Sequence, residues 1–435
     1  MQRGTPFGWL AVLCTLAIGM GVARAEPKML KGPYLQDLAP TSITVMWQLE
    51  SAAEARLVVT GPGGERVYQV EAARLSEAAV TGLTPSSRYR YRVEIAGHAW
   101  DGEFATAPPI GKDVPFSFAV LGDTRDGIEP HRRVTQRIAQ DVPDFILGTG
   151  DMVDDGSRQD QWQEFFDIEN PLLRNNVYFP AVGNHDRQGR GRTADTYRAY
   201  FSVPENGNDT ERYYAFTYAT SRILVLDSNV YSFALTDQTA WIERELIAAR
   251  QDPDIRHIFV VMHHPPFSIS LHGGNRELRD RWAPLFTLYQ VSAVFSGHDH
   301  VYTRAERDGV RYFVSGGGGA PLYPKRPRDP VDIAAVKKFE RVFHYLRVNV
   351  TGPTIEISGI RADGTTIETT TWSEGPQMEP ETPPELAAAG ATTTMSAAPP
   401  RPGQVAKRDS STMWIAFGGV GLLLAAAVVV LTLKR

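Results

Sequence analysis

Two histidines, His298 and His300, stand two residues apart directly after the apolar run 291–295 and a Ser-Gly pair. Imidazole nitrogens at the end of a predicted strand are typical metal ligands. Other apolar runs also end in ligand-type side chains: Gly-Asp at 122–123, Gly-Asp at 150–151, Gly-Asn-His-Asp at 183–186 and His-His at 263–264. Oxygen and imidazole donors without thiolate favour Fe, Mn, Zn or similar metals over calcium.

This set of side chains is larger than one cation needs. Two metal ions roughly 3.5–4 Å apart, with one carboxylate as a bridge, would use it. The chemistry that most requires such a pair is the in-line attack of a metal-bound hydroxide on phosphorus. One metal lowers the pKa of the water, and both offset charge on the phosphoryl oxygens.

The predicted elements bring these strand ends together. From Pro115 onward, strand-like runs alternate with helix-like runs, and helices are expected near 131–141, 159–168 and 236–250. This alternation predicts an α/β fold with paired sheet and helix layers, in the order α/β/β/α. Ligand sites in such sheets lie outside the carboxyl ends of the strands, where glycine lets the backbone turn sharply. Strands after Arg341 are expected to be antiparallel and to complete the sheets.

Taken together, the motifs resemble the signature of calcineurin-like metallophosphoesterases. They match in order and approximate spacing across roughly residues 115–350: Asp123, GD at 150–151, GNHD at 183–186, MHHPP at 262–266 and GHDH at 297–300. The segment "GHDHVYTRAE" (297–306) and the preceding "NRELRDRWAPLFTLYQ" are most similar to the purple acid phosphatase branch. The resemblance implies a layered metallophosphoesterase sandwich that hydrolyses phosphoesters with two divalent or trivalent metal ions, Fe, Mn or Zn.

The resemblance also implies the metal ligands. Asp123 and His300 would bind the first metal, Asp151 would bridge, and the second metal would be bound by Asn184, His263 and His298.

Three further residues receive catalytic or substrate-binding roles from the resemblance. His185 would contact the phosphate or protonate the leaving oxygen, as a histidine does well near neutral pH. Asp186 would orient His185. His272, nine residues after His263, matches a substrate-facing histidine of the purple branch.

Two positions depart from the family pattern. Arg125 stands where the broader family often has histidine, and Asp154 stands where the purple branch has tyrosine. The first metal then has one protein ligand fewer, and either Asp154 or water takes that place. Arg125 is either a bidentate clamp on a phosphate oxygen or an ordinary surface ion pair. His264 is either adjacent to the ligands or merely packed.

The segment before the α/β part has a different pattern. Residues 28–107 contain short alternating strands, including a hairpin at 54–70 with Gly-Pro-Gly-Gly at its tip. These predict a small all-β sandwich that resembles a fibronectin type III domain, at 26–110, before a catalytic domain at 111–373.

The two ends of the chain predict export and a membrane anchor. Residues 1–25 have a basic start, a short apolar core and Ala-Arg-Ala before Glu26, which is typical of a signal peptide. Residues 374–412 are rich in Pro, Ala, Thr and Ser and predict a disordered linker. Residues 413–433 are apolar and uncharged, as in a transmembrane helix, and Lys434-Arg435 follows. The catalytic domain would then lie on the outer, periplasmic or extracellular, side.

Composition limits the other function classes. The formal net charge is -5, so nothing favours a nucleic-acid partner. The expected partner is a phosphorylated small molecule. Two alternatives stay open: a phosphodiesterase acting on cyclic nucleotides or other diesters at the same site, and a non-catalytic binding protein with a vestigial metal site.

Overall fold

The computed structural model describes residues 28–189, 193–205, 211–229 and 234–374. The predicted signal peptide, the predicted transmembrane helix and all of the predicted linker except Glu374 lie outside these residues. Among the described residues, no helix is both long and apolar enough to cross a membrane.

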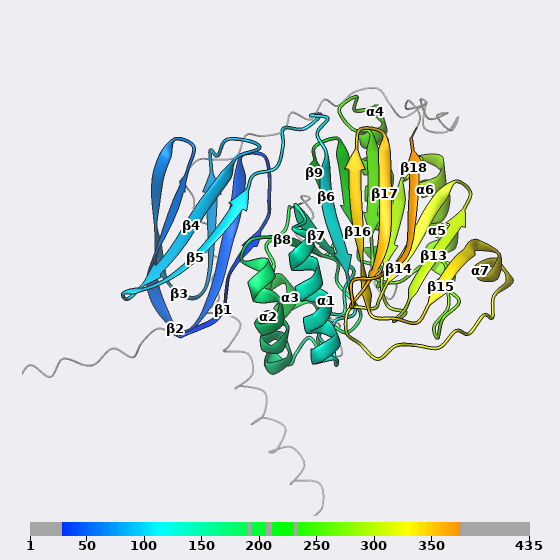
Figure 1. Cartoon of the computed structure of the whole chain (residues 1–435), viewed down its shortest axis with the longest axis horizontal. Helices are drawn as coiled ribbons and strands as arrows, with labels where there is room; N and C mark the ends of the chain where they lie inside the picture. The colour runs from blue at the N-terminus through cyan, green and yellow to red at the C-terminus, as the bar shows by residue number, and fades with distance from the viewer. Residues whose placement is uncertain (1–27, 190–192, 206–210, 230–233, 375–435) are drawn as a thin grey trace, which may run out of the picture.

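The N-terminal part is all-β, as predicted, and lies at one end of the molecule (Figure 1). Its strands are β1 (Met29–Gln36), β2 (Ser42–Gly61), β3 (Gly64–Thr81), β4 (Arg88–Ile95) and β5 (His98–Ala105). The first half of β2 pairs with β1 and β3, and its second half pairs with β3 and β4. The long hairpin of β2 and β3 therefore contributes to both layers of the sandwich. The resemblance to a fibronectin type III domain stays a prediction.

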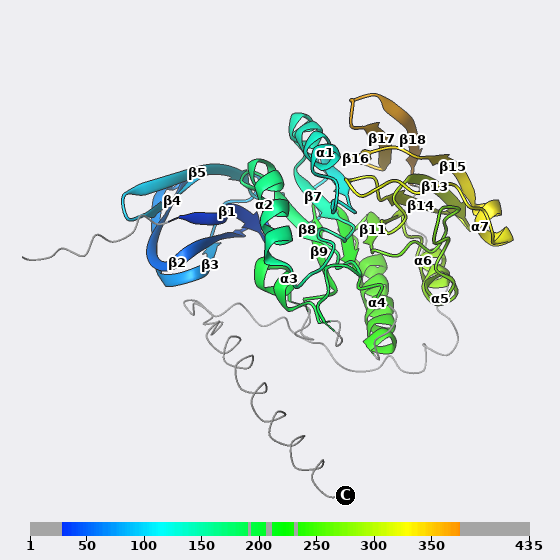
Figure 2. The same ribbon diagram turned by 90° about the horizontal axis from the view of Figure 1, so that it is seen from below.

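The α/β part contains two sheets that face each other, with helices on both outer faces (Figures 1 and 2). In the first sheet, the order β18-β17-β16-β6-β7-β8 continues into β1. Its strands are β6 (Phe116–Leu121), β7 (Phe145–Gly148), β8 (Val177–Pro180), β16 (His344–Thr351), β17 (Thr354–Arg361) and β18 (Thr366–Ser373). β6, β7 and β8 are parallel, whereas the C-terminal strands are antiparallel, as predicted.

The second sheet has the order β15-β13-β14-β12-β11-β10-β9. Its strands are β9 (Tyr214–Tyr218), β10 (Ser221–Val225), β11 (His257–Val261), β12 (Ala293–Ser296), β13 (Tyr302–Arg307), β14 (Val310–Ser315) and β15 (Val336–Glu340). β10, β11, β12 and β14 run parallel, so their carboxyl ends share one edge. The α/β/β/α layering is therefore confirmed.

The helices complete the layers. They are α1 (Ile128–Asp141), α2 (Gln159–Leu173), α3 (Asp195–Tyr200), α4 (Ala234–Gln251), α5 (Arg276–Arg281), α6 (Ala283–Leu288) and α7 (Pro330–Ala335). The α1 and α2 helices lie outside the first sheet, and α4, α5 and α6 lie outside the second (Figure 2). α2 continues five residues past the predicted end because its later residues, Leu172 and Leu173 among them, are buried against the core.

The core between the two sheets is aromatic. The Phe118 ring from β6 lies 5.3 Å from Phe259 of β11 and 5.9 Å from Phe295 of β12, between ring centroids. Phe179 of β8 stacks on Phe216 of β9 at 3.8 Å. Such contacts contribute about 0.5–1.5 kcal/mol each beyond area burial. They fix the two sheets relative to each other, and so fix the strand ends that carry the site.

The N-terminal sandwich is joined directly to the α/β part. Leu35 of β1 pairs in parallel with Val177 of β8. The Tyr34 hydroxyl donates to the Tyr200 carbonyl at 2.8 Å, and the Tyr91 hydroxyl donates to the Arg174 carbonyl at 2.7 Å. The first sheet therefore runs from one part of the molecule into the other.

Candidate metal centre

Both sheets direct their parallel strand ends toward one place. Asp123 follows β6, Asp151 follows β7, and His298 follows β12. Asp123 accepts hydrogen bonds from the His298 backbone amide at 3.1 and 2.9 Å, which joins the first sheet to the second across 175 residues of chain. The convergence expected from the strand ends is therefore present.

The residues expected at the second metal position form a tight group. The Asn184 side-chain oxygen lies 3.0 Å from His263 Nε2 and 3.1 Å from His298 Nδ1. Asp151 Oδ1 lies 3.3 Å from His263 Nε2. Donor atoms of Asp123, Asp151 and His263 all lie within 4.8 Å of one another. One carboxylate therefore stands between the second position and Asp123.

The first metal position is formed by fewer groups. His300 Nε2 lies 3.5 Å from Asp123 Oδ1, and both side chains are buried. The orientation of the His300 ring is held by its other nitrogen, because Nδ1 lies 2.8 Å from the Pro321 carbonyl. The Nδ1 of His263 lies 2.8 Å from the Thr149 carbonyl in the same way.

These carbonyl contacts decide how the two imidazoles can act. When Nδ1–H donates to a carbonyl, the lone pair of a neutral ring is on Nε2. In both rings that atom faces the carboxylates. The donor set of carboxylate, amide oxygen and imidazole nitrogen, with its outer atoms already bonded, fits a pair of borderline metal ions.

The backbone is strained at the predicted ligands. Asp123, Asp151 and His298 have φ values of 55°, 55° and 66°, in the left-handed region that non-glycine residues rarely adopt. Each such residue costs on the order of 1–3 kcal/mol and persists where the surroundings impose it. Beside Asp151 the packing is very close, since a Cβ on Gly183 would lie 2.1 Å from Asp151 Oδ1. The fold thus holds these donors in conformations that they would not adopt alone.

Burial and neighbouring charges shift the pKa values of the cluster residues in different directions. Burial alone would raise the pKa of Asp151, but the adjacent His263 outweighs it and holds that pKa well below its usual range. Burial opposes a charge on His263, yet the Asp151 carboxylate raises the pKa of His263 to about 9. Burial and the neighbouring His264 and His263 hold the pKa of His298 well below its usual value. Metal binding would displace the proton on His263.

The predicted partnership of Asp186 with the His185 ring is wrong. The Asp186 carboxylate accepts from the backbone amides of Asp151, Met152 and Gly183 at 2.9, 2.8 and 2.8 Å. The His185 ring lies against Asp154 instead: its Nδ1 is 2.7 Å from the Asp154 carbonyl and 3.3 Å from the Asp154 carboxylate. Asp186 therefore shapes the loop that carries Asp151, and Asp154 orients His185.

Arg125 and Asp154, the two residues that depart from the family pattern, contact each other. An Arg125 guanidinium nitrogen lies 2.9 Å from Asp154 Oδ1, and Arg125 Nε lies 3.6 Å from Asp151 Oδ2. The Arg125 side chain is 11% exposed and pairs with the buried Asp151 as well as with the exposed Asp126 and Asp154. Asp154 is occupied by Arg125 and His185, and its carboxylate has no contact with Asp123 or His300 among the described residues.

Histidines 264 and 272 lie at the edge of the cluster. The His264 and His272 rings each lie 4.4 Å from His298, between ring centroids. His264 Nδ1 is 2.9 Å from the Ser228 hydroxyl, and burial and His263 lower the pKa of His264 to about 3. His264 is therefore adjacent to the ligands rather than remote from them. His272 is exposed, with its backbone amide bonded to Asp299 at 3.0 Å.

Two residues near the site were not predicted. Tyr323 stacks on His300 with centroids 3.9 Å apart and rings inclined by 17°, and it lies 5.3 Å from His272. Ser228, after β10, accepts from the amides of both His263 and His264. Neither residue lies in a ligand motif. The only sequence signal for Ser228 is its position after a strand-like run, and Tyr323 has none.

The α/β part matches a known family. Residues 116–302 match the family described as calcineurin-like phosphoesterase. The chain therefore carries a domain of this family of metal-dependent phosphoesterases.

Similar proteins include purple acid phosphatases. The chain is 26% identical over 294 residues to the purple acid phosphatase of Glycine max, covering 63% of this chain and 61% of that protein. It is 30% identical over 268 residues to an uncharacterized protein of Mycobacterium tuberculosis, covering 53% of this chain and 51% of the relative. The chain thus spans between half and two thirds of the length of these relatives.

A solved structure shares the fold over most of the chain. The purple acid phosphatase PPD1 from yellow lupin (Lupinus luteus) superposes with a TM-score of 0.70 at 16% identity, covering 84% of this chain and 77% of that one. At this identity the likeness concerns the fold alone. The superposed share of this chain is larger than the α/β part alone. This is consistent with a fold that also includes the all-β part.

Proposed function

We propose that this protein is a metal-dependent phosphoester hydrolase that acts on phosphate monoesters. The observation that carries the proposal is the Asp151 carboxylate, which lies 3.3 Å from His263 on one side and within 4.8 Å of the Asp123 donor atom on the other. The family of the domain and the purple acid phosphatase relatives support the same reaction.

Asp123, Asp151 and His300 would hold one metal ion, and Asp151 would also contribute to the second, with Asn184, His263 and His298. When bound, the metal pair supplies an activated water and neutralises charge on the phosphoryl oxygens. Metal identity stays open among Fe, Mn and Zn, since the donor set suits all three.

His185 is proposed to protonate the leaving oxygen. Its Nδ1 is engaged by the Asp154 carbonyl at 2.7 Å, and its Nε2 lies 4.0 Å from Asp151 Oδ2, facing the metal cluster. The Asp154 carboxylate also lies 3.3 Å from Nδ1 and helps to orient the ring. Arg125 is proposed to turn from its carboxylate partners to the phosphate when substrate binds, because its planar guanidinium matches two phosphate oxygens.

Hydrolysis of three esters by the metal-loaded protein tests this proposal. Para-nitrophenyl phosphate is expected to be a better substrate than bis-para-nitrophenyl phosphate, and His185→Asn should lower kcat about 10²–10³-fold for ethyl phosphate. The loss should be much smaller for para-nitrophenyl phosphate, whose leaving group needs no proton. Preference for the bis ester would favour the phosphodiesterase alternative. No turnover of any ester with Mn, Zn or Fe would favour a vestigial binding site.

We also propose that the chain is exported and held at a membrane by residues 413–433. This proposal is supported by the sequence alone, through the apolar stretch and the basic pair after it. Expressed whole, the protein should stay in the membrane fraction after a high-pH carbonate wash, and deletion of 413–435 should release it. Recovery of the full chain in the soluble fraction would contradict the anchor.

A further inference from the structure

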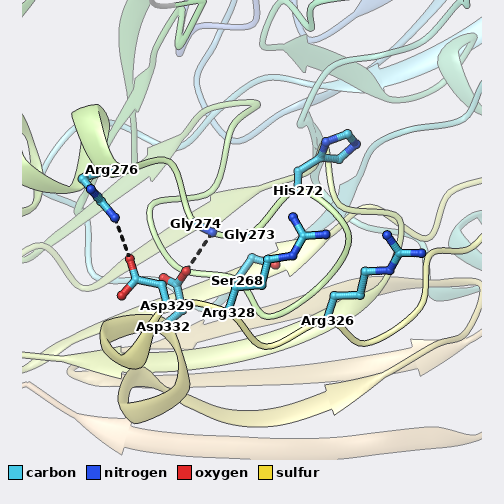
Figure 3. Close-up of a pocket in the computed structure, with 9 residues that line it drawn as sticks. All are labelled: Ser268, His272, Gly273, Gly274, Arg276, Arg326, Arg328, Asp329 and Asp332. Atoms are coloured by element: carbon cyan, nitrogen blue, oxygen red, sulfur yellow. Dashed lines mark hydrogen bonds and ion pairs between the residues drawn. The ribbon is translucent and has the colours of Figure 1, made fainter.

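A cavity of about 390 Å³ lies beside His272 (Figure 3). His272 forms part of its lining, and the same imidazole packs 4.4 Å from the His298 ring. One side chain therefore separates the cavity from the predicted ligands. A substrate that reached from the metal centre past His272 would enter this cavity.

The cavity has an excess of positive charge on one side. Arg326 and Arg328 line it, and Figure 3 shows both guanidinium groups directed toward the side where His272 lies. Among the described residues, no ion pair or aromatic contact engages either guanidinium. Both side chains are exposed at the cavity, so they are available to an anion.

The acidic side chains of the cavity are already neutralised. Arg279 pairs with Asp329 at 2.8 Å and with Asp332 at 2.7 Å. Asp332 also accepts from the Gly274 amide at 3.0 Å, and Asp329 lies 3.6 Å from Arg276. These carboxylates therefore do not compete for Arg326 and Arg328.

The cavity is built onto the metal-binding strand end. Asp299, between His298 and His300, accepts from the Ser268 hydroxyl and from the His272 amide. The Arg326 amide donates to the Ile269 carbonyl at 2.7 Å, which fixes the arginine-bearing loop against the same segment. The backbone of Arg326 is thus linked to the metal-binding strand end through the segment 268–272.

We infer that this cavity is a subsite for a second phosphate group of the substrate. The inference rests on the proposed function, because it assumes that the scissile phosphate occupies the metal centre. Guanidinium groups bind phosphate through paired, charge-assisted hydrogen bonds, and two unpaired ones at a cavity suit a dianion. The substrate class is therefore a bisphosphate, with one phosphate cleaved at the metal centre and the other held by Arg326 and Arg328.

Matched substrates test this inference. Initial rates are measured for butanediol and hexanediol bisphosphates and for butyl and hexyl phosphates, with the metal-loaded wild type and the Arg326→Gln/Arg328→Gln variant. The ratio of kcat/KM for the bisphosphate to kcat/KM for the monophosphate should fall about tenfold in the variant, the effect expected for a lost charged hydrogen bond. The fall should shrink as ionic strength rises.

Lys325→Gln is the matched control, since it removes one positive charge from the same loop outside the cavity lining. It should leave the ratio within twofold of wild type. An unchanged ratio in the double arginine variant, with both esters still hydrolysed, would overturn the subsite and leave the proposed function standing. An equal fall with Lys325→Gln would also overturn it, because the effect would then be general attraction. No hydrolysis of any ester by wild type would overturn the proposed function, and this inference with it.

Discussion

Asp151→Asn should lower kcat/KM for para-nitrophenyl phosphate at least about a thousandfold and reduce bound metal from two ions to one or fewer per chain. Asp151 supplies a carboxylate near both predicted metal positions, 3.3 Å from His263 Nε2 and within 4.8 Å of the Asp123 donor. Asparagine keeps the shape of the side chain but has one neutral oxygen. Steady-state kinetics and metal analysis of the purified variant give the two readouts.

The Asp151→Asn variant is expected to remain folded. Asparagine tolerates the left-handed backbone at this position, where φ is 55°. Asp160→Asn is the control, because Asp160 is an exposed carboxylate paired with Arg158. It should bind two metals and retain wild-type rates. Two tightly bound metals and a rate within tenfold of wild type in Asp151→Asn would show that this carboxylate does not bridge.

The second large effect is expected from Asp186→Asn, although Asp186 has no contact with the His185 ring. Both oxygens of Asp186 accept hydrogen bonds from backbone amides, among them those of Asp151 at 2.9 Å and Gly183 at 2.8 Å. An asparagine must turn its NH₂ group toward at least one of these donors. Lost hydrogen bonds to a buried carboxylate cost about 1.5–3 kcal/mol each, and relief of the repulsion from Asp151 offsets part of this. The free energy of unfolding should fall by about 2 kcal/mol.

The same Asp186→Asn change should weaken metal binding about 10–100-fold, because residues that position a ligand loop act on affinity through it. Denaturant unfolding of the metal-free protein and a metal titration separate the two effects. Asp160→Asn should change neither quantity measurably. Wild-type affinity combined with lost stability would mean that Asp186 supports the fold without shaping the site.

The strand-end motifs could be predicted because each is local. An apolar run followed by Gly-Asp or Gly-Asn-His-Asp marks the carboxyl end of a buried parallel strand. The sheets bring such ends together at one edge. The predicted group of Asp123, Asn184 and His298 therefore lies together in the structure. Alternation also predicted the all-β character of residues 28–107, although it did not reveal that β2 and β3 are 20 and 18 residues long.

The parts that could not be predicted depend on contacts between distant loops. Tyr323 reaches His300 from a loop that follows the glycine run 316–319, and its neighbours in sequence contain no ligand motif. The carboxylate beside the His185 ring belongs to Asp154, from another strand end, whereas the family resemblance implied Asp186. The buried backbone amides of the turn at Asp151 need a hydrogen-bond acceptor. The Asp186 carboxylate is that acceptor, so it does not face the His185 ring.

Anomalous diffraction from crystals soaked in manganese tests directly whether two metal ions share the Asp151 carboxylate. Two anomalous peaks are predicted, one among Asn184, His263 and His298 and one beside Asp123 and His300, with Asp151 between them. A single peak with no contact to Asp151, or no peak in this cluster at saturating manganese, would contradict a pair of metal ions that shares this carboxylate.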